Sequence, residues 1–357
     1  MNLLVTGGAG FIGSNFIKYM LKHHDYRIVN LDLLTYAGNL ENLEDIEGDA
    51  RYKHIKGDIC NRELVESIFR RFDIDMVVNF AAESHVDRSI EDPEVFLRTN
   101  IMGTQALLDI AKDFWKIDLF DKYCKEYKKG VKFVQVSTDE VYGSLGETGL
   151  FKETTCLNPN SPYSASKASA DMIVRAYSET YGLPVNITRC SNNYGPYQFP
   201  AKLIPLMINN AINDKPLPVY GDGKQVRDWL YVEDHCSAID SVLHKGKPGE
   251  VYNIGGHNEK QNIEVVKTIC NILDELKPQA NGQKYESLIK FVEDRPGHDL
   301  RYAIDAGKIE KDLGWKPLET FETGIRKTVE WYLNNLDWSR RVQDGSYQRE
   351  RLGVNAQ

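Results

Sequence analysis

Hydrophobic and polar positions follow two rhythms along the first half of the chain. Short apolar runs rich in β-branched residues predict strands at 2–6, 27–31, 53–55, 76–80, 132–136 and 185–189. Amphipathic stretches between them predict helices at 12–22, 62–72, 93–112 and 163–181. Strands and helices that alternate in this way are typical of βαβ units, so we expect an α/β fold with a doubly wound parallel sheet.

The regular alternation weakens after about Asn192. A group of prolines between 196 and 218 interrupts the pattern, and helical patterns follow at 233–244, 263–276 and 321–334. We expect a first domain at 1–191, with a return segment near 226–245, and a smaller C-terminal α/β lobe formed mainly by 192–357. The stretch 115–129 is dense in aromatic residues and lysines, and it is expected to form a surface helix.

The composition narrows the class of protein. Hydrophobic residues make up 41% of the 357 positions and charged residues 27%, which is typical of a globular chain. The net charge of −8 argues against a nucleic-acid partner. No apolar run reaches the roughly 18 to 20 residues of a membrane span, and no basic leader opens the chain, so we expect a soluble cytoplasmic protein. The cysteines and histidines lack metal-ligand spacing, so no metal site is expected.

A glycine-rich segment, TGGAGFIG, follows the first predicted strand and opens the first predicted helix. Glycines allow a tight turn and a close approach of the backbone to a pyrophosphate, which the helix N-terminus attracts. Asp32, at the end of the second strand, can accept hydrogen bonds from a ribose and repel a 2′-phosphate, which favours NAD over NADP. The alternative is a glycine-rich turn without a ligand. Asp58 is a candidate adenine contact or, equally, the N-cap of the next helix.

Tyr163 and Lys167 lie four residues apart in YSASK, which places both on one face of a predicted helix. An ammonium beside a phenol favours the phenolate and lowers the phenol pKa from about 10 toward neutrality, so the tyrosine can act as a base on an alcohol. The same spacing also occurs at Tyr52 and Tyr220 in strand-like or turn-like surroundings, so spacing alone proves little. The alternative is a packing tyrosine near a surface lysine.

Together, TGGAGFIG and YSASK resemble the extended short-chain dehydrogenases/reductases, the group of nucleotide-sugar epimerases and dehydratases, with a Rossmann-type NAD-binding domain. Further segments are similar to the 4,6-dehydratases of thymidine diphosphate glucose: NFAAESHVDRSI from residue 79, STDEVYG from 137, SNNYGPYQFP from 191, KPLPVYGDG from 215, RDWLYVEDH from 227 and DRPGHDLRYAID from 294. The acids Asp139 and Glu140 distinguish this group from the 4-epimerases, which lack adjacent acids there.

The resemblance implies three steps: oxidation of the sugar at C4, elimination of water across C5 and C6, and return of the hydride to C6. It implies that Tyr163 is the base for the oxidation, that Glu140 takes the C5 proton, that Asp139 protonates the departing hydroxyl and that Thr138 binds the sugar at C4. We therefore predict a raised pKa for Asp139, from burial and its carboxylate neighbour, and an ionised Glu140. Because successive strand residues face opposite ways, the strand must end near Thr138.

The resemblance also assigns the binding residues. It implies contacts to NAD from Gly7, Gly10, Phe11, Ile12, Gly13, Asp32, Leu33, Thr35, Asp58, Ile59, Ala81, Ala82, Thr99, Tyr163, Lys167 and Asn193. It implies contacts to the nucleotide sugar from Ser84, Thr138, Asn192, Lys202, Leu203, Pro218, Tyr220, Arg227, Asn262, Arg295 and His298. The guanidinium groups of Arg227 and Arg295, with His298, suit the diphosphate.

By the same analogy we expect a homodimer, formed through the helices at 93–112 and 163–181, and a role in deoxysugar biosynthesis such as that of rhamnose. Three alternatives stay open. The first is a uridine nucleotide as substrate, the second is a 4-epimerase that oxidises C4 without elimination, and the third is a non-catalytic NAD-binding relative.

Overall fold

A computed structural model of the chain describes residues 1–294 and 299–343. Its largest element is a seven-stranded sheet, in the order β10-β6-β5-β4-β1-β2-β3, in which all neighbouring strands are parallel. The strands are β1 (Asn2–Thr6), β2 (Arg27–Asp32), β3 (Tyr52–Lys56), β4 (Met76–Asn79), β5 (Lys132–Thr138), β6 (Val185–Cys190) and β10 (Val251–Ile254). The predicted doubly wound Rossmann-type α/β fold is confirmed.

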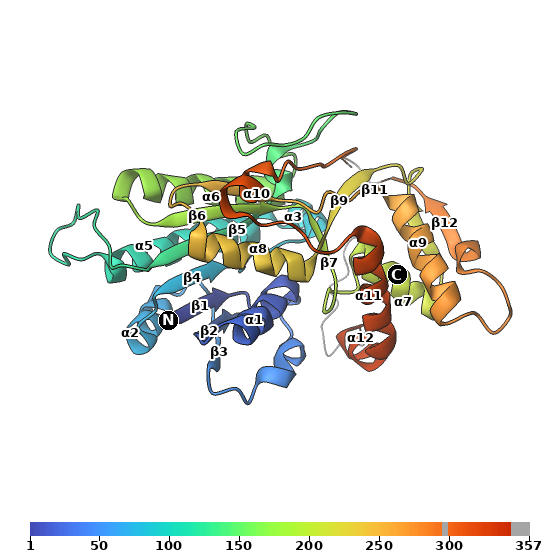
Figure 1. Cartoon of the computed structure of the whole chain (residues 1–357), viewed down its shortest axis with the longest axis horizontal. Helices are drawn as coiled ribbons and strands as arrows, with labels where there is room; N and C mark the ends of the chain where they lie inside the picture. Colours follow the sequence, from blue (N-terminus) through green and yellow to red (C-terminus); the bar gives the residue numbers. More distant parts are fainter. Residues whose placement is uncertain (295–298, 344–357) are drawn as a thin grey trace.

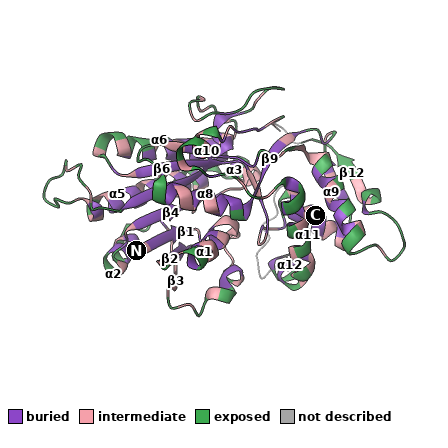
Figure 2. Ribbon diagram, in the orientation of Figure 1, coloured by how far each residue is buried: buried purple, intermediate pink, exposed green. Residues whose placement is uncertain are grey.

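Helices cover both faces of this sheet (Figure 1). Along β1, Leu3 and Val5 pack against α1 and α8, whereas Leu4 points to the opposite layer of α2, α5 and α6. The central strands are therefore buried on both faces, whereas the edge strand β3 is only partly buried, and many exposed positions lie on the outer sides of the helices (Figure 2). The helices of these layers are α1 (Phe11–His23), α2 (Arg62–Phe72), α3 (Val86–Glu91), α4 (Pro93–Phe96), α5 (Thr104–Trp115), α6 (Pro162–Tyr181), α8 (Val232–Lys245) and α10 (Gly307–Leu313).

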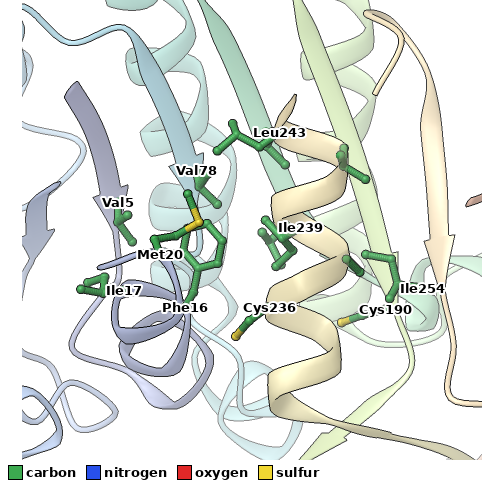
Figure 3. Packing of buried hydrophobic residues seen from close by; sticks show 14 of the residues in the cluster. Val5, Phe16, Ile17, Met20, Val78, Cys190, Cys236, Ile239, Leu243 and Ile254 are labelled. Carbon is green, nitrogen blue, oxygen red and sulfur yellow. The ribbon is translucent and has the colours of Figure 1, made fainter. Parts of the chain in front are cut away.

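Helix α8 belongs to the body of the sheet although it comes late in the chain. Figure 3 shows Ile239 and Leu243 of α8 facing the sheet beside Phe16 and Met20 of α1. The strand that follows α8 is β10, which joins the sheet edge beside β6. The return to the sheet therefore continues beyond 226–245 and reaches Ile254.

The smaller lobe lies at the end of the sheet opposite the N-terminus (Figure 1). It has its own apolar core, built around Met207, Val266 and Ile325. Two small sheets support it, one in the order β11-β9-β7 and one that pairs β12 with β8. Its elements are β7 (Asn192–Tyr194), α7 (Leu203–Ile212), β8 (Leu217–Tyr220), β9 (Val226–Tyr231), β11 (Glu259–Gln261), α9 (Asn262–Leu276), β12 (Ile289–Val292), α11 (Phe321–Asn334) and α12 (Leu336–Gln343).

Two predicted helices differ from the structure. The helix expected at 93–112 contains a π-helical segment, η2 (Leu97–Gly103), between α4 and α5. The surface helix expected at 115–129 is wrong, because α5 ends at Trp115 and Lys116 is extended. The carboxylates of Asp118 and Asp121 accept hydrogen bonds from backbone N–H groups two residues later, which favours turns over a helix there.

Short 3-10 turns complete the fold at η1 (Leu40–Ile46), η3 (Asp139–Tyr142) and η4 (Tyr285–Leu288). Within the described ranges, we find no helix whose length and apolarity would let it cross a membrane.

Candidate active site

A cleft runs along the carboxyl ends of the central strands, where the two parts of the molecule meet. It is lined by the loops after β1, β2, β4, β5 and β6, and by residues of the smaller lobe such as Lys202 and Trp338. Ligands in open parallel sheets bind at this edge. The topology therefore places the glycine-rich turn, the acidic pair and YSASK in one cavity.

The glycine-rich turn leaves room that larger residues would fill. Gly7 has φ +68°, and a Cβ atom there would lie 2.7 Å from the backbone nitrogen of Ala81. A Cβ on Gly13 would lie 2.4 Å from the carbonyl oxygen of Gly7. Helix α1 begins after Gly10, which offers no side chain to cap its first N–H groups. These N–H groups and the positive end of the helix dipole suit a pyrophosphate.

Asp32 holds the next part of the cofactor pocket. Its carboxylate accepts hydrogen bonds from the backbone nitrogens of Ala9, at 2.8 Å, and Leu34, at 2.7 Å. Burial raises its pKa, and these two hydrogen bonds oppose the rise. The carboxylate thus joins the glycine-rich turn to the loop after β2, and its remaining lone pairs face the cleft that it lines.

The side chain of Asp58 also lines the cleft, and its Oδ1 accepts a hydrogen bond from the backbone nitrogen of Cys60 at 2.8 Å. Asn61, not Asp58, caps α2 by accepting from the nitrogen of Leu64. The alternative that Asp58 is the N-cap is therefore wrong, which leaves the cofactor contact as its prediction.

The strand β5 ends at Thr138, as the geometry of the acidic pair requires. The chain turns there into the short helix η3, and the Thr138 hydroxyl accepts a hydrogen bond from the nitrogen of Glu140 at 3.2 Å. This turn brings Asp139 and Glu140 into the same cleft instead of onto opposite faces of the sheet. Thr138 is thus a helix cap and a cleft residue at once.

Asp139 is almost fully buried, with 2% of its surface exposed. Burial raises its pKa well above the usual range, and the charges of Glu140 and Asp228 add to this, while Arg227 opposes it. Its Oδ2 atom is buried without a hydrogen-bond partner among the described residues. The direction of the pKa shift and its two predicted causes agree with the expectation from the sequence, and they favour the protonated acid at neutral pH.

Tyr163 and Lys167 lie in the first two turns of α6, which begins with a capping box between Ser161 and Ser164. Burial raises the pKa of Tyr163, as does the charge of Glu140, while a hydrogen bond with Thr138 lowers it. The ammonium of Lys167 donates to the carbonyl oxygen of Val136 at 2.7 Å. The expected net lowering of the Tyr163 pKa is therefore wrong for this structure, because burial and the charge of Glu140 raise that pKa, while the Lys167 ammonium binds the backbone of Val136.

A buried ion pair supports this part of the cleft from behind. The Nε atom of Arg189 donates to Asp171 at 2.9 Å, and its guanidinium donates to the hydroxyl of Tyr142 at 3.0 Å. Tyr142 donates in turn to Asn253 at 2.7 Å. Asp171 lies one turn after Lys167, and Tyr142 is the last residue of η3. The network therefore ties the helix that carries the tyrosine to the turn that carries the acids.

The π-helical segment η2 places a second polar anchor beside the cleft. Asn100 receives a hydrogen bond from the nitrogen of Glu83 and donates to the oxygen of Glu83 and to Ser166. Thr99 lines the cleft next to it. The insertion of an extra residue into a helical turn is often found at functional sites, and here it fixes the loop after β4 against α6.

Every residue of the predicted catalytic and cofactor sets lines this cleft, as do the predicted substrate residues Ser84, Thr138, Asn192 and Lys202. Other predicted substrate residues lie in the lobe, outside the lining of the cleft: Leu203, Pro218, Tyr220, Arg227 and Asn262. Arg227 is buried, and its guanidinium donates to the carbonyl oxygens of Val226 and Asp299. Arg295 and His298 lie outside the described residues.

The sequence analysis missed several lining residues. Glu83 and Ser137 lie beside predicted site residues at strand ends, so their position could have signalled them. Tyr36, Phe199 and Trp338 come from three distant segments, and no local pattern marks them. The indole of Trp338 donates to Asn42 at 3.0 Å and so joins α12 to the cofactor end of the cleft.

Comparison with known proteins agrees with this geometry. The sequence profile of the family described as GDP-mannose 4,6 dehydratase matches residues 4–328. A dTDP-glucose 4,6-dehydratase of Xanthomonas campestris pv. campestris (strain B100) is 58% identical, over 98% of both chains. One of Escherichia coli is 56% identical, over 99% of both chains.

Solved structures lead to the same group. A dTDP-glucose 4,6-dehydratase from Bacillus anthracis, in complex with NAD, has a TM-score of 0.84 and 53% identity and covers 96% of this chain and 99% of its own. One from Streptomyces venezuelae, with NAD and TYD bound, has a TM-score of 0.85 and 46% identity, over 96% and 100%. A UDP-glucose 4-epimerase from Thermotoga maritima has a TM-score of 0.82 but 29% identity, over 94% and 100%.

The fold and the cleft define an extended short-chain dehydrogenase/reductase with a dehydratase's acidic pair. Within this class, the chain belongs to the GDP-mannose 4,6 dehydratase family and, inside it, to the dTDP-glucose 4,6-dehydratases.

Proposed function

We propose that this chain is an NAD-dependent enzyme that converts dTDP-glucose to dTDP-4-keto-6-deoxyglucose and water. The observation that carries the proposal is the turn η3, which brings Asp139 and Glu140 into the same cleft as Tyr163. A 4-epimerase needs the tyrosine and lysine but no acid and base for elimination. The buried Asp139 and the adjacent Glu140 in this cleft therefore favour the dehydratase.

NAD fits the cofactor end of the cleft. The glycine-rich turn provides the close backbone approach, and the carboxylate of Asp32 suits a ribose and disfavours a 2′-phosphate. When bound, NAD would supply the hydride acceptor for the oxidation at C4 and the hydride donor for the reduction at C6. The chain's own residues hold the sugar and move the protons.

Tyr163 accepts the proton of the C4 hydroxyl as that carbon is oxidised. Thr138 lowers the pKa of the phenol through a hydrogen bond. We assign to Lys167, one helical turn away, the role of favouring the phenolate through its positive charge. Thr138 lines the cleft, and we assign its hydroxyl to the oxygen at C4. Because burial raises the pKa of Tyr163, its action as a base depends on Thr138 and Lys167.

Elimination uses the acidic pair in two different states. The new ketone at C4 acidifies the hydrogen at C5, which Glu140 removes as a carboxylate. Asp139, buried and with a raised pKa, keeps its proton near neutrality and delivers it to the hydroxyl that leaves C6. One proton is thus taken at C5 and one is given at C6, and the atoms lost are those of water. When hydride later adds at C6, a proton must return to C5, and Glu140, protonated in the elimination, is its donor.

The smaller lobe is assigned to the nucleotide. Asn192 and Lys202 line the cleft, and Lys202 directly precedes α7. The charge of Arg227 lowers the pKa of Asp139, and we assign its guanidinium to a phosphate, for which it would exchange its present backbone partners. Two cations from the lobe would balance the charge of the diphosphate in a protein with a net charge of −8.

We further infer a homodimer. Exposed apolar side chains gather on the outer helices, with Met102 of η2 58% exposed and Met172 of α6 59% exposed. Burial of these side chains against a second copy would stabilise a two-fold contact. Sedimentation of the wild type and of a Met102→Glu/Met172→Glu variant tests it, since only the variant should be monomeric.

All six cysteines are free thiols, which supports a reducing compartment such as the cytoplasm. The product is a 4-keto-6-deoxy sugar nucleotide, the kind of intermediate from which deoxysugars such as rhamnose are made.

A product analysis tests the proposed activity. The enzyme is incubated in parallel with dTDP-glucose and UDP-glucose, and the sugars are followed by mass spectrometry and NMR. We expect loss of one water, with the thymidine nucleotide turned over faster. Formation of a galactose isomer would mean a 4-epimerase, and a faster uridine nucleotide would overturn the assigned substrate.

A further inference from the structure

A cluster of two histidines and one aspartate lies away from the cleft, where the end of α1 meets α8. His24 follows the last residue of α1, and Asp240 and His244 lie one turn apart on α8. Figure 3 shows the two helices beside each other, joined by buried side chains such as Met20 and Ile239. The packing of α1 against α8 thus brings together side chains that are 216 residues apart in the sequence.

The three side chains converge on one point. The Nε2 atom of His24 lies 2.9 Å from Oδ1 of Asp240, and Nδ1 of His244 lies 2.8 Å from the same oxygen. One ligand atom from each residue lies within 4.8 Å of the others, and this is the one such cluster among the described residues. The side chains are 26%, 17% and 27% exposed, so the cluster is half-buried but open to an ion.

The surroundings of the cluster match those of a metal site. His244 points its second ring nitrogen, Nε2, at the hydroxyl of Tyr26, 2.6 Å away. Histidine ligands of metals usually direct their other nitrogen to a hydrogen-bond partner, which fixes the tautomer and the ring orientation. Nδ1 of His244 also lies 2.9 Å from the carbonyl oxygen of Asp240, and it would exchange its hydrogen bond for the ion. The ring of His24 stacks on that of His244, with centroids 4.9 Å apart, and on that of Tyr26, at 5.1 Å. The imidazole groups are therefore held in place before any ion binds.

We propose that His24, Asp240 and His244 form a binding site for a divalent transition metal ion of the zinc class. Two imidazole nitrogens and one carboxylate oxygen are ligands that Zn²⁺ accepts at about 2.0–2.2 Å, with a fourth position left for water. At such bond lengths tetrahedral ligands stand roughly 3.3 Å apart. The cluster reaches this arrangement when its atoms separate by a few tenths of an ångström.

The ion would link α1 and α8, two helices that support the cleft although the ion site lies far from it. Helix α1 spans 13 residues, so its far end lies about 20 Å from the glycine-rich turn. Helix α8 packs on β5 and β6, the strands that lead to the acidic pair and to Asn192. A metal bound here would stabilise the packing of α1 on α8 and leave the chemistry of the cleft unchanged.

The experiment uses the full-length enzyme after dialysis against a chelator. Zn²⁺ is titrated by calorimetry, and Co²⁺ by its visible absorption, which reports tetrahedral nitrogen and oxygen ligands. We expect one ion per chain, and a melting temperature that rises with the concentration of Zn²⁺. His24→Gln and Asp240→Asn should abolish this binding. Tyr26→Phe keeps all three ligands and should weaken it by about 10- to 100-fold.

Two control variants distinguish this site from non-specific binding of metal ions by surface side chains. His257→Gln removes a surface histidine that pairs with a single carboxylate, Glu310, at 2.6 Å, and Cys156→Ser removes an exposed thiol. Both should bind one ion with the affinity of the wild type, and all variants should keep the wild-type kcat. Absence of one-to-one binding, or equal binding by the His24 and Asp240 variants, would overturn the proposal. If those variants fold poorly, an unchanged affinity in Tyr26→Phe would overturn it instead.

Discussion

The two ends of the cleft are built in different ways. The cofactor end consists of backbone turns directly after β1 and β2, and its main side chain, Asp32, is held by two backbone N–H groups. The proposed nucleotide end consists of side chains of the smaller lobe, and one of them, Arg227, lies outside the cleft lining and donates to the lobe's own carbonyl oxygens. We therefore expect a cofactor to bind a preformed surface, whereas a phosphate can bind Arg227 only if that side chain gives up these partners.

This difference suits a reaction that begins and ends with the same form of its cofactor. A rigid cofactor end favours retention of NAD between turnovers, because little conformational entropy is lost on binding. A nucleotide end made of side chains with alternative partners lets substrate enter and product leave. We therefore expect substitutions at the cofactor end to change the NAD content and those at the nucleotide end to change KM. Substitutions of the catalytic residues between the two ends should change kcat.

The largest effect on kcat is expected for Tyr163→Phe, at the catalytic residues between the two ends. The change removes the group that accepts the C4 proton, and it should lower kcat by about 10²- to 10⁴-fold. The glycine-rich turn is untouched, so NAD bound to the purified protein should be unchanged, as measured after denaturation. A near-normal kcat would show that another group is the base.

The cofactor end is tested by Gly13→Ala. The new Cβ atom would lie 2.4 Å from the carbonyl oxygen of Gly7 and 2.8 Å from Cα of Gly8, so the backbone has to move. A shift of this size should weaken NAD binding and lower kcat/KM on the order of 10²-fold. Gly48→Ala is the matched control, because nothing lies within 4 Å of its Cβ position. Equal NAD contents in both variants would contradict a preformed cofactor end.

The nucleotide end is tested by Arg227→Met. Loss of a charged hydrogen bond to the diphosphate costs about 1.5–3 kcal/mol, which should raise KM roughly 10- to 150-fold while the NAD content stays normal. Arg326→Met, at an exposed arginine that pairs with Glu275, serves as the control. Loss of NAD from the Arg227 variant would mean that the two ends are not separate.

The smallest effect is expected in the pH dependence of kcat. Asp139 must be protonated to act as an acid, so kcat should fall as the pH rises through the pKa of Asp139. Arg227 lowers that pKa, and its removal should raise it and move the alkaline limb of the kcat profile to higher pH. A limb that stays in place in Arg227→Met, or moves to lower pH, would contradict the role assigned to Asp139.

Much of the cofactor end could be predicted because its residues lie where predicted strands end. The strand ends at Thr6, Asp32 and Thr138 determine which loops meet in the cleft. The local pattern predicts the first two to within one residue, whereas it ends the third strand at 136, and the end near Thr138 follows from the geometry that the acidic pair requires. The helix at 62–72 was predicted with the bounds of α2, since its apolar face repeats at the helical period.

The remainder depends on contacts between distant segments. The π-helical turn at η2 and the hydrogen bond from Trp338 to Asn42 arise only when the chain is folded. The strand β10 is four residues long and joins the sheet by pairing with β6, so its local pattern is weak. The expected absence of a metal site rested on spacing within single segments, which gives no signal for ligands divided between α1 and α8.

The central claim is that one cleft oxidises the sugar, eliminates water and returns the same hydrogen. The most direct measurement is the conversion of dTDP-glucose that carries deuterium at C4, with the product analysed by NMR and mass spectrometry. The account predicts loss of one water and deuterium at C6 of the product. Deuterium lost to solvent, or an intact or epimerised sugar, would contradict the roles of Asp139 and Glu140.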